Sequence, residues 1–198
     1  MSKAKKEIKK SSSLSNISEP ELFYHLEDGG EILLIKNFIP NTDSLFDELL
    51  ANIKWKKFKY VVYNREVESP RYMNIINFDN GSCPQILPQL CLLKKYIEER
   101  FKMNFSYAVL NYYRDGKDYI GFHSDGETKK DTSIVSFSIG ATRRFVLKHK
   151  YKPDIKYIFS LEDGDLMLLN YQAIKTKYKH SIPKMANAEK RISITFRV

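Results

Sequence analysis

The sequence predicts an α+β fold that is mostly β, with N-terminal helices placed against a small barrel or sandwich of strands. The chain has 198 residues, which is enough for one domain that buries a core of its own. Aromatic residues make up 13% of it, mainly Tyr and Phe, and this mixture suits sheets better than helical bundles. After Met103, short runs of strand-forming residues alternate with turn signals.

The chain begins with a polar segment. Residues 1–18 are rich in Lys and Ser and almost lack large apolar side chains, so they cannot offset the entropy cost of ordering. We expect a disordered basic tail there. Its lysines suit a solvated tail, a nuclear signal or a nucleic-acid arm.

The predicted helices come next. A short strand is expected at 32–38, followed by a helix that opens at Asn41, Thr42 or Asp43 and carries apolar residues at helical spacing. A second helix is expected over 88–101, where apolar residues form one stripe.

Six strands are predicted after the helices, because β-forming runs are separated by turn signals such as Asp115-Gly116 and Asp163-Gly164. They cover residues 105–113, 132–140, 143–150, 156–161, 166–170 and 191–198. Spacings of this kind indicate a small barrel or sandwich.

Charge and cysteine content bear on partners and location. The formal net charge is +9, and a positive field of this size attracts polyanions such as nucleic acid or anionic lipid, unless it only solubilises the surface. The two cysteines are Cys83 and Cys91, and no apolar run has the length of a membrane span. We expect an intracellular protein, nuclear or cytoplasmic, with free thiols and no membrane partner.

A candidate metal site lies in the second half of the chain. His123 and Asp125 are two residues apart, so in an extended chain they point to the same face and can reach one metal ion. His180 follows several strands later. Two histidines and one carboxylate form the facial triad of non-haem iron(II) oxygenases, which leaves coordination positions open. Alone, His-x-Asp is a weak signal, since a lone histidine is more often structural.

The C-terminal strand alternates polar and apolar residues. Its polar face carries Arg191, Ser193, Thr195 and Arg197, and the residues between them are apolar. The arginines lie in water if this is an ordinary amphipathic strand. If the apolar face packs on the helices, the arginines point into the barrel and require anionic partners, which a dicarboxylate cosubstrate would supply. The planar fork of arginine suits bidentate carboxylate binding.

Asn111 and Tyr113 form another i, i+2 pair, on the strand before the His-x-Asp motif. Their amide and phenol groups can bond ligand oxygens. Either residue could equally be a routine strand residue.

Together these motifs resemble the AlkB alkylation-repair dioxygenases, and within them the eukaryotic-type homologues that act on DNA. The resemblance rests on the order of NYYRDG, HSDGE, His180 and RISITFR, and it includes Pro70-Arg71 and the ATRRFVLKHK strand. It implies a double-stranded β-helix, or jelly-roll, barrel flanked by N-terminal helices. Residues 19–198 would form a single domain and a monomer, with helical support and a nucleotide-recognition lid over 19–103 and the catalytic barrel over 104–198.

The resemblance also implies the cofactors. His123, Asp125 and His180 would hold iron(II), and 2-oxoglutarate and O2 would be the cosubstrates. The residues that would bind 2-oxoglutarate are Asn111, Tyr113, Arg191, Ser193 and Arg197.

Within that set, Arg191 and Tyr113 would hold the distal carboxylate, and Arg197 and Asn111 the carboxylate and keto end at the metal. Ser193 stands where the family usually has Asn, so one hydrogen bond to the cosubstrate would be weaker or replaced by water.

The implied substrate is double-stranded DNA that carries 1-methyladenine or 3-methylcytosine, whose methyl group would be oxidised and released as formaldehyde. The expected contacts are an aromatic finger, an acidic residue at the base edge and basic residues, which are Tyr63, Glu127, Arg71, Arg143, Lys148 and Lys150. An RNA demethylase, a protein hydroxylase and a catalytically silent nucleic-acid-binding module remain alternatives.

Overall fold

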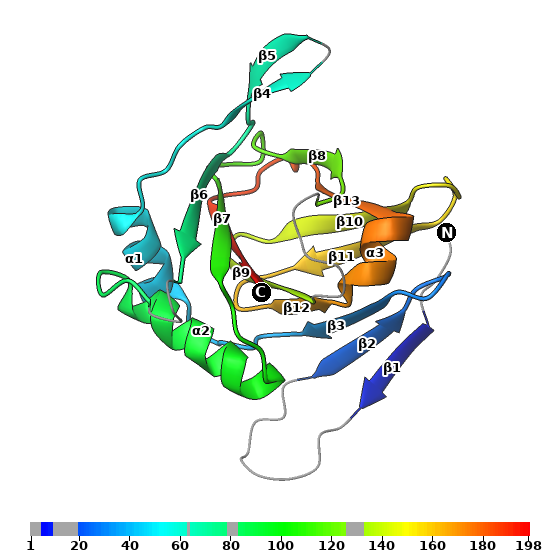
Figure 1. Cartoon of the computed structure of the whole chain (residues 1–198), viewed down its shortest axis with the longest axis horizontal. Helices are drawn as coiled ribbons and strands as arrows, with labels where there is room; N and C mark the ends of the chain where they lie inside the picture. Colours follow the sequence, from blue (N-terminus) through cyan, green and yellow to red (C-terminus); the bar gives the residue numbers. More distant parts are fainter. Residues whose placement is uncertain (1–4, 10–19, 63, 79–82, 126–132) are drawn as a thin grey trace.

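Two facing sheets form the centre of the molecule in the computed structural model (Figure 1), which describes residues 5–9, 20–62, 64–78, 83–125 and 133–198. Among these residues an eight-stranded sheet has the order β1-β2-β3-β12-β9-β14-β7-β6, and a four-stranded sheet has the order β11-β10-β13-β8. We call them the major and the minor sheet.

The strands of the major sheet are β1 (Lys5–Lys9), β2 (Glu21–His25), β3 (Glu31–Ile35), β12 (Leu166–Leu169), β9 (Ile134–Gly140), β14 (Arg191–Arg197), β7 (Tyr107–Tyr113) and β6 (Tyr72–Asn77). The minor sheet contains β11 (Lys156–Leu161), β10 (Arg143–His149), β13 (Tyr178–Ile182) and β8 (Ile120–His123). All pairings are antiparallel, in agreement with the expected jelly-roll barrel.

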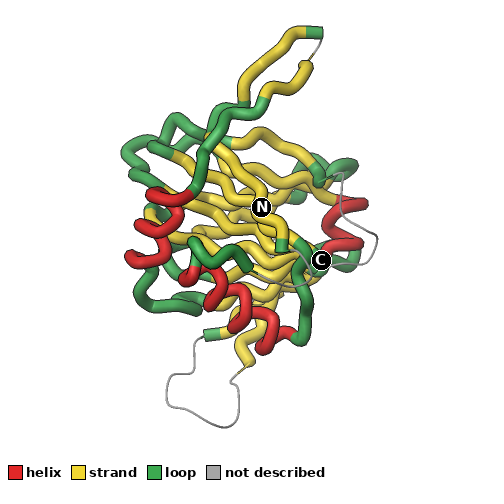
Figure 2. The backbone as a smooth tube through the Cα atoms, turned by 60° about the vertical axis from the view of Figure 1, so that its left-hand side comes forward, coloured by secondary structure: helices red, strands yellow, loops and turns green. Residues whose placement is uncertain are grey.

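The helices α1 (Asp43–Asn52) and α2 (Pro88–Phe101) cover the outer face of the major sheet, and α3 (Tyr171–Lys177) lies on the other flank (Figure 2). A separate hairpin of β4 (Lys59–Val62) and β5 (Arg65–Glu68) projects from the barrel. No helix among the described residues combines the length and the apolarity that crossing a membrane requires.

The two faces of β14 separate two cores. Ile192, Ile194 and Phe196 are fully buried in the core beneath α1 and α2. Arg191 and Arg197 alternate with them and point to the space between the sheets, where a second core lies. The predicted packing of the apolar face is therefore confirmed, and the arginines do not lie in water.

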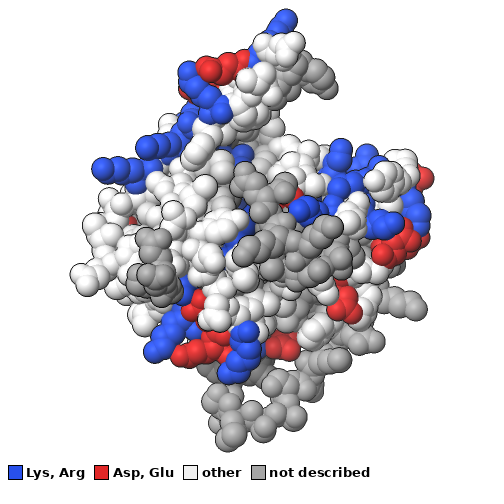
Figure 3. Space-filling view, in the orientation of Figure 1, with Lys and Arg blue, Asp and Glu red and all other residues white. Residues whose placement is uncertain are grey.

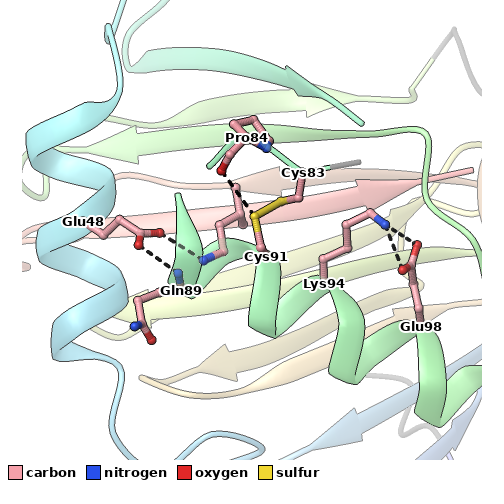
Figure 4. Close-up of a disulfide and its surroundings, with 8 residues drawn as sticks. Glu48, Cys83, Pro84, Gln89, Cys91, Lys94 and Glu98 are labelled. Carbon is pink, nitrogen blue, oxygen red and sulfur yellow. Dashed lines mark hydrogen bonds and ion pairs between the residues drawn. A yellow bond between two sulfur atoms is a disulfide. The ribbon is translucent and has the colours of Figure 1, made fainter. Parts of the chain in front are cut away.

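Helix α2 has the bounds that the sequence predicts, for local reasons. Pro88 occupies the first turn, where its missing N–H costs nothing, and Lys102 ends the helix in the left-handed conformation at φ 53°. The carboxylate of Glu48 on α1 accepts hydrogen bonds from the backbone N–H groups of Gln89 and Leu90, at 2.8 and 3.0 Å (Figure 4). Glu48 thus caps α2 from another helix.

The expectation of free thiols is wrong, because Cys83 and Cys91 form a disulfide (Figure 4). The loop that carries Cys83 returns to the start of α2 and places the two Cα atoms 5.6 Å apart, within the span of a disulfide. The pairing depends on this loop path, which cysteine content alone does not reveal.

The expectation of a disordered tail fails over Lys5–Lys9, which form β1 and pair with β2. A strand can join a sheet edge through backbone hydrogen bonds, so few apolar side chains are required. Residues 1–4 and 10–19 lie outside the described residues. The strand expected at 32–38 is confirmed as β3, whereas β2 and β6, which also belong to the major sheet, lie before residue 104 where helical support was expected.

Candidate active site

A cavity of about 550 Å³ lies between the two sheets. Strands β7, β9 and β14 supply one wall, and β8, β10 and β13 supply the other. Phe58 and Tyr60, beside and within the projecting hairpin, also line it, and both are more than 40% exposed. The cavity therefore has charged and polar side chains set among apolar ones inside the barrel, and aromatic side chains toward solvent.

His123, Asp125 and His180 meet in this cavity. His123 ends β8 and lies directly opposite His180 on β13, with the ring centroids 4.2 Å apart. Asp125 follows two residues after His123, and the three candidate ligand atoms all lie within 4.8 Å of one another. The predicted convergence of these residues is confirmed.

Neighbouring groups orient the two imidazoles. Nδ1 of His123 lies 2.9 Å from the carbonyl oxygen of Gly121. A carbonyl only accepts hydrogen bonds, so Nδ1 carries the proton and the lone pair of Nε2 is directed toward the cluster, 3.4 Å from Asp125 Oδ1. The ring of His180 stacks on Phe145, at 5.4 Å between centroids. Two imidazole nitrogens and one carboxylate oxygen form a donor set that suits Fe(II).

The protonation states also suit a metal. Burial raises the pKa of the Asp125 carboxyl, but His123, His180 and Arg197 outweigh burial and hold that pKa well below its usual range. Burial lowers the pKa of His180 to about 4, and the neighbouring His123 acts in the same direction. Asp125 is therefore ionised and His180 neutral near pH 7, the forms that coordinate metals.

Arg191 provides a buried positive charge at the cavity wall. Its side chain is 1% exposed, and Nη2 donates a hydrogen bond to Ser138 Oγ at 2.9 Å. Nε and Nη1 have no hydrogen-bond partner among the described residues. Burial lowers the pKa of Arg191 to about 10, against the opposing effect of Tyr113. Because a buried guanidinium with unpaired donors is costly, this wall fits an anionic ligand such as a carboxylate.

Arg197 lies at the other end of the same strand. Its Nη2 is 2.9 Å from Asp125 Oδ2, so Arg197 contacts the metal-binding cluster. The prediction that both arginines point into the barrel is confirmed.

The Asn-x-Tyr pair lies beside the arginine strand. In the register of β7 and β14, Tyr113 is opposite Arg191 and Asn111 is opposite Ser193. Arg71 Nε donates a hydrogen bond to Asn111 Oδ1 at 2.7 Å, which leaves the Asn111 amide nitrogen available to donate to a ligand oxygen. All five residues line the cavity.

The sequence analysis did not identify Ser136, which lines the cavity, or Ser138, which accepts a hydrogen bond from Arg191. Ser136 and Ser138 alternate with apolar residues on β9, and Ser136 Oγ lies 3.4 Å from Ser193 Oγ. The sequence pattern that indicates them is a pair of small polar residues at i, i+2 within a buried, otherwise apolar strand.

The expected phosphate contact by Arg143 is wrong. The side chain is fully buried, and Nη2 donates hydrogen bonds to the carbonyl oxygens of Asp118 and Pro183, at 2.7 and 2.8 Å. Its guanidinium also lies 5.1 Å from the centre of the Tyr113 ring. Arg143 is the first residue of β10 and faces inward, so it fastens loops and supports Tyr113 instead of reaching solvent.

Arg71, another expected substrate contact, lines the cavity, whereas Lys148 and Lys150 do not. Lys150 Nζ donates a hydrogen bond to the carbonyl oxygen of Lys175. Lys148 alternates with the inward-facing Leu147 and points away from the cavity. Tyr63 and Glu127 lie outside the described residues.

Comparisons with known proteins agree with this geometry. Residues 31–197 match the model of the 2OG-Fe(II) oxygenase superfamily. The alpha-ketoglutarate-dependent dioxygenase alkB homolog 3 of Rattus norvegicus is 35% identical over 181 residues, which cover 80% of this chain and 60% of that protein. The DNA oxidative demethylase ALKBH2 of Homo sapiens is 30% identical over 121 residues, which cover 56% of this chain and 46% of that protein.

A solved structure, described as the structure of OsALKBH1, has the same fold. It superposes with a TM-score of 0.58 at 17% identity and covers 84% of this chain and 97% of the other. The matched regions are about 60% of the length of the alkB homolog 3 proteins. The family match over residues 31–197 shows that this chain belongs to the 2OG-Fe(II) oxygenase superfamily, and the His-Asp-His cluster of its cavity fits Fe(II).

Proposed function

We propose that this dioxygenase removes methyl groups from alkylated bases in DNA, with 1-methyladenine and 3-methylcytosine as substrates. The observation that carries the proposal is the place of the metal cluster, at one wall of a cavity whose exposed side has aromatic residues. Phe58 and Tyr60 offer flat apolar surfaces on which a base can stack. Named relatives include DNA oxidative demethylases.

With iron and 2-oxoglutarate bound, one atom of O2 enters succinate as the cosubstrate loses CO2, the other is inserted into a C–H bond of the N-methyl group, and the hydroxymethyl group leaves as formaldehyde. The protein would hold the iron, the cosubstrate and the methylated base in position for this reaction. Arg191, with Tyr113, would bind the distal carboxylate, and Asn111 and Arg197 the opposite end. The buried walls would limit water around the reacting groups.

A base within a duplex cannot reach a cavity between two sheets, so the target must be flipped out. Flipping costs a few kcal/mol, and the cost is smaller for an alkylated base that no longer pairs. We propose that this lower cost of flipping is the first step at which the enzyme discriminates alkylated bases from undamaged ones.

The central experiment measures succinate and formaldehyde release on oligonucleotides that carry 1-methyladenine or 3-methylcytosine. We expect equal amounts of both products, and restoration of the unmodified base. Methylated RNA and methylated peptides are tested in parallel. The DNA is tested both as a duplex and as a single strand. Turnover confined to RNA or to peptides would refute the DNA assignment and favour the corresponding alternative, and turnover of none of them would favour a binding module.

Action on duplex DNA requires a side chain that fills the gap left by the flipped base. We propose that Tyr63 does so, because it lies in the chain between β4 and β5, the strands of the hairpin that projects from the barrel. Tyr63→Ala should reduce turnover of a methylated duplex much more than turnover of the same oligonucleotide as a single strand. The matched control is Tyr151→Ala, which removes a 74% exposed tyrosine on the β10–β11 loop. Equal losses on both substrates would contradict the finger role.

A further inference from the structure

A row of three lysines crosses the minor sheet. In the antiparallel registers, Lys148 on β10 lies directly opposite Lys156 on β11 and directly opposite Lys179 on β13. Residues that are directly opposite share one face of a sheet. The three side chains therefore stand side by side, and we call them the lysine row.

The lysine row faces away from the catalytic cavity. Leu147, Tyr157 and Tyr178 are the sequence neighbours of the three lysines, and all are buried between the sheets. Side chains alternate along a strand, so the lysines occupy the opposite, outer face. Lys156 and Lys179 are exposed and Lys148 is partly exposed. Figure 3 shows Lys and Arg side chains gathered toward this end of the molecule, near β10, β11 and α3.

The arrangement works against folding. Like charges directly opposite each other on neighbouring strands repel. No ion pair between a lysine of the row and an acidic group is present among the described residues. Lys150, just beyond β10, lies in the same field: burial lowers its pKa, and the charges of Lys179 and Lys175 lower it further. A row of unpaired like charges is explained if an anionic partner neutralises it.

We infer that the lysine row is a nucleic-acid-binding surface, separate from the catalytic cavity, that contacts consecutive phosphates of one strand. Two inter-strand spacings give the row a length of roughly 10 Å. One strand of a duplex carries a charge about every 3.4 Å along the axis, so the row matches about three phosphates. The inference rests on the proposed nucleic-acid substrate. The inference goes beyond that proposal because it assigns binding of the DNA backbone to the outer face of the minor sheet.

The test replaces all three residues by glutamine and measures binding of an unmodified DNA duplex without iron or 2-oxoglutarate. The slope of log K against log salt should flatten by about 2 to 3, since each lost phosphate contact removes about 0.9. The matched control replaces the exposed Lys95, Lys102 and Lys190 by glutamine, which changes the charge equally on other faces. Its slope should stay near that of the unchanged protein.

Two further measurements separate binding from folding. The thermal midpoint of the row variant should not fall, because the substitutions relieve repulsion, and succinate formation without nucleic acid should be unchanged. A salt slope equal to that of the control variant would overturn the inference. So would loss of binding to vesicles of anionic lipid with no loss of DNA binding. Because the duplex is unmodified, flattening of the slope supports the surface even if the demethylation assay fails.

Discussion

Replacing Asp125 by Ala is expected to abolish iron-dependent turnover, the largest effect of any substitution in the cavity. The carboxylate is ionised, and its candidate ligand oxygen lies within 4.8 Å of the ligand nitrogens of both histidines. Its loss therefore removes one of three metal ligands and the negative charge that offsets the cation. Metal affinity should fall with activity. Titration of the protein with Fe(II) under argon, or with Co(II) followed by absorbance, measures this directly.

The same substitution leaves Arg197 without its partner Asp125, which lies 2.9 Å away. Breaking a buried ion pair typically costs about 3 to 5 kcal/mol, so reduced stability could imitate a catalytic loss. Asp125→Asn is the matched control, because it keeps the shape and one hydrogen-bond acceptor for Arg197. Both variants should lose metal binding, and Asp125→Asn should lose less free energy of unfolding than Asp125→Ala. A folded Asp125→Asn protein with normal metal affinity and turnover would contradict the site.

Elements with strong local signals could be predicted from the sequence. Helix α2 has the predicted bounds because Pro88 and the left-handed Lys102 mark its ends, and the apolar runs of β7, β9 and β14 were found within about two residues. Strands β8 and β13 were missed as strands. β8 is only four residues long with a glycine inside, and β13 mixes Lys, His and Ser with apolar residues.

These two missed strands position the metal cluster. Residue types suggested that His123 and His180 share a metal, but their direct opposition arises from the pairing of β8 with β13, a long-range register that no local pattern contains. The misassignment of Arg143 has a related cause. Charge suggested a surface residue, whereas the inward alternation of β10 places it against Tyr113. Net charge describes the whole chain and does not say which basic residues are buried.

The second large effect is expected at Arg191. Arg191→Ala should weaken 2-oxoglutarate binding by roughly two to three orders of magnitude, because removing one partner of a buried charge pair costs about 3 to 5 kcal/mol. Nε and Nη1 face no hydrogen-bond acceptor among the described residues, so they are available to the carboxylate of the cosubstrate. Calorimetric titration with 2-oxoglutarate measures the change.

Stability separates a binding role of Arg191 from a packing role. In the protein without cosubstrate the buried guanidinium has Ser138 Oγ as a hydrogen-bond partner, and burial lowers its pKa to about 10, so its charge opposes folding. Arg191→Met keeps most of the side-chain volume without the charge, and its unfolding midpoint should equal or exceed that of the unchanged protein while 2-oxoglutarate binding is lost.

Arg191→Lys keeps the charge without the planar fork and should lose an intermediate amount of affinity for 2-oxoglutarate. Arg144→Met, at the exposed neighbour of Arg143, controls for removal of one positive charge and should bind 2-oxoglutarate normally. If Arg191→Met bound 2-oxoglutarate normally and unfolded at a lower temperature, Arg191 would be a packing residue of the barrel, and the cosubstrate carboxylate would require another cation.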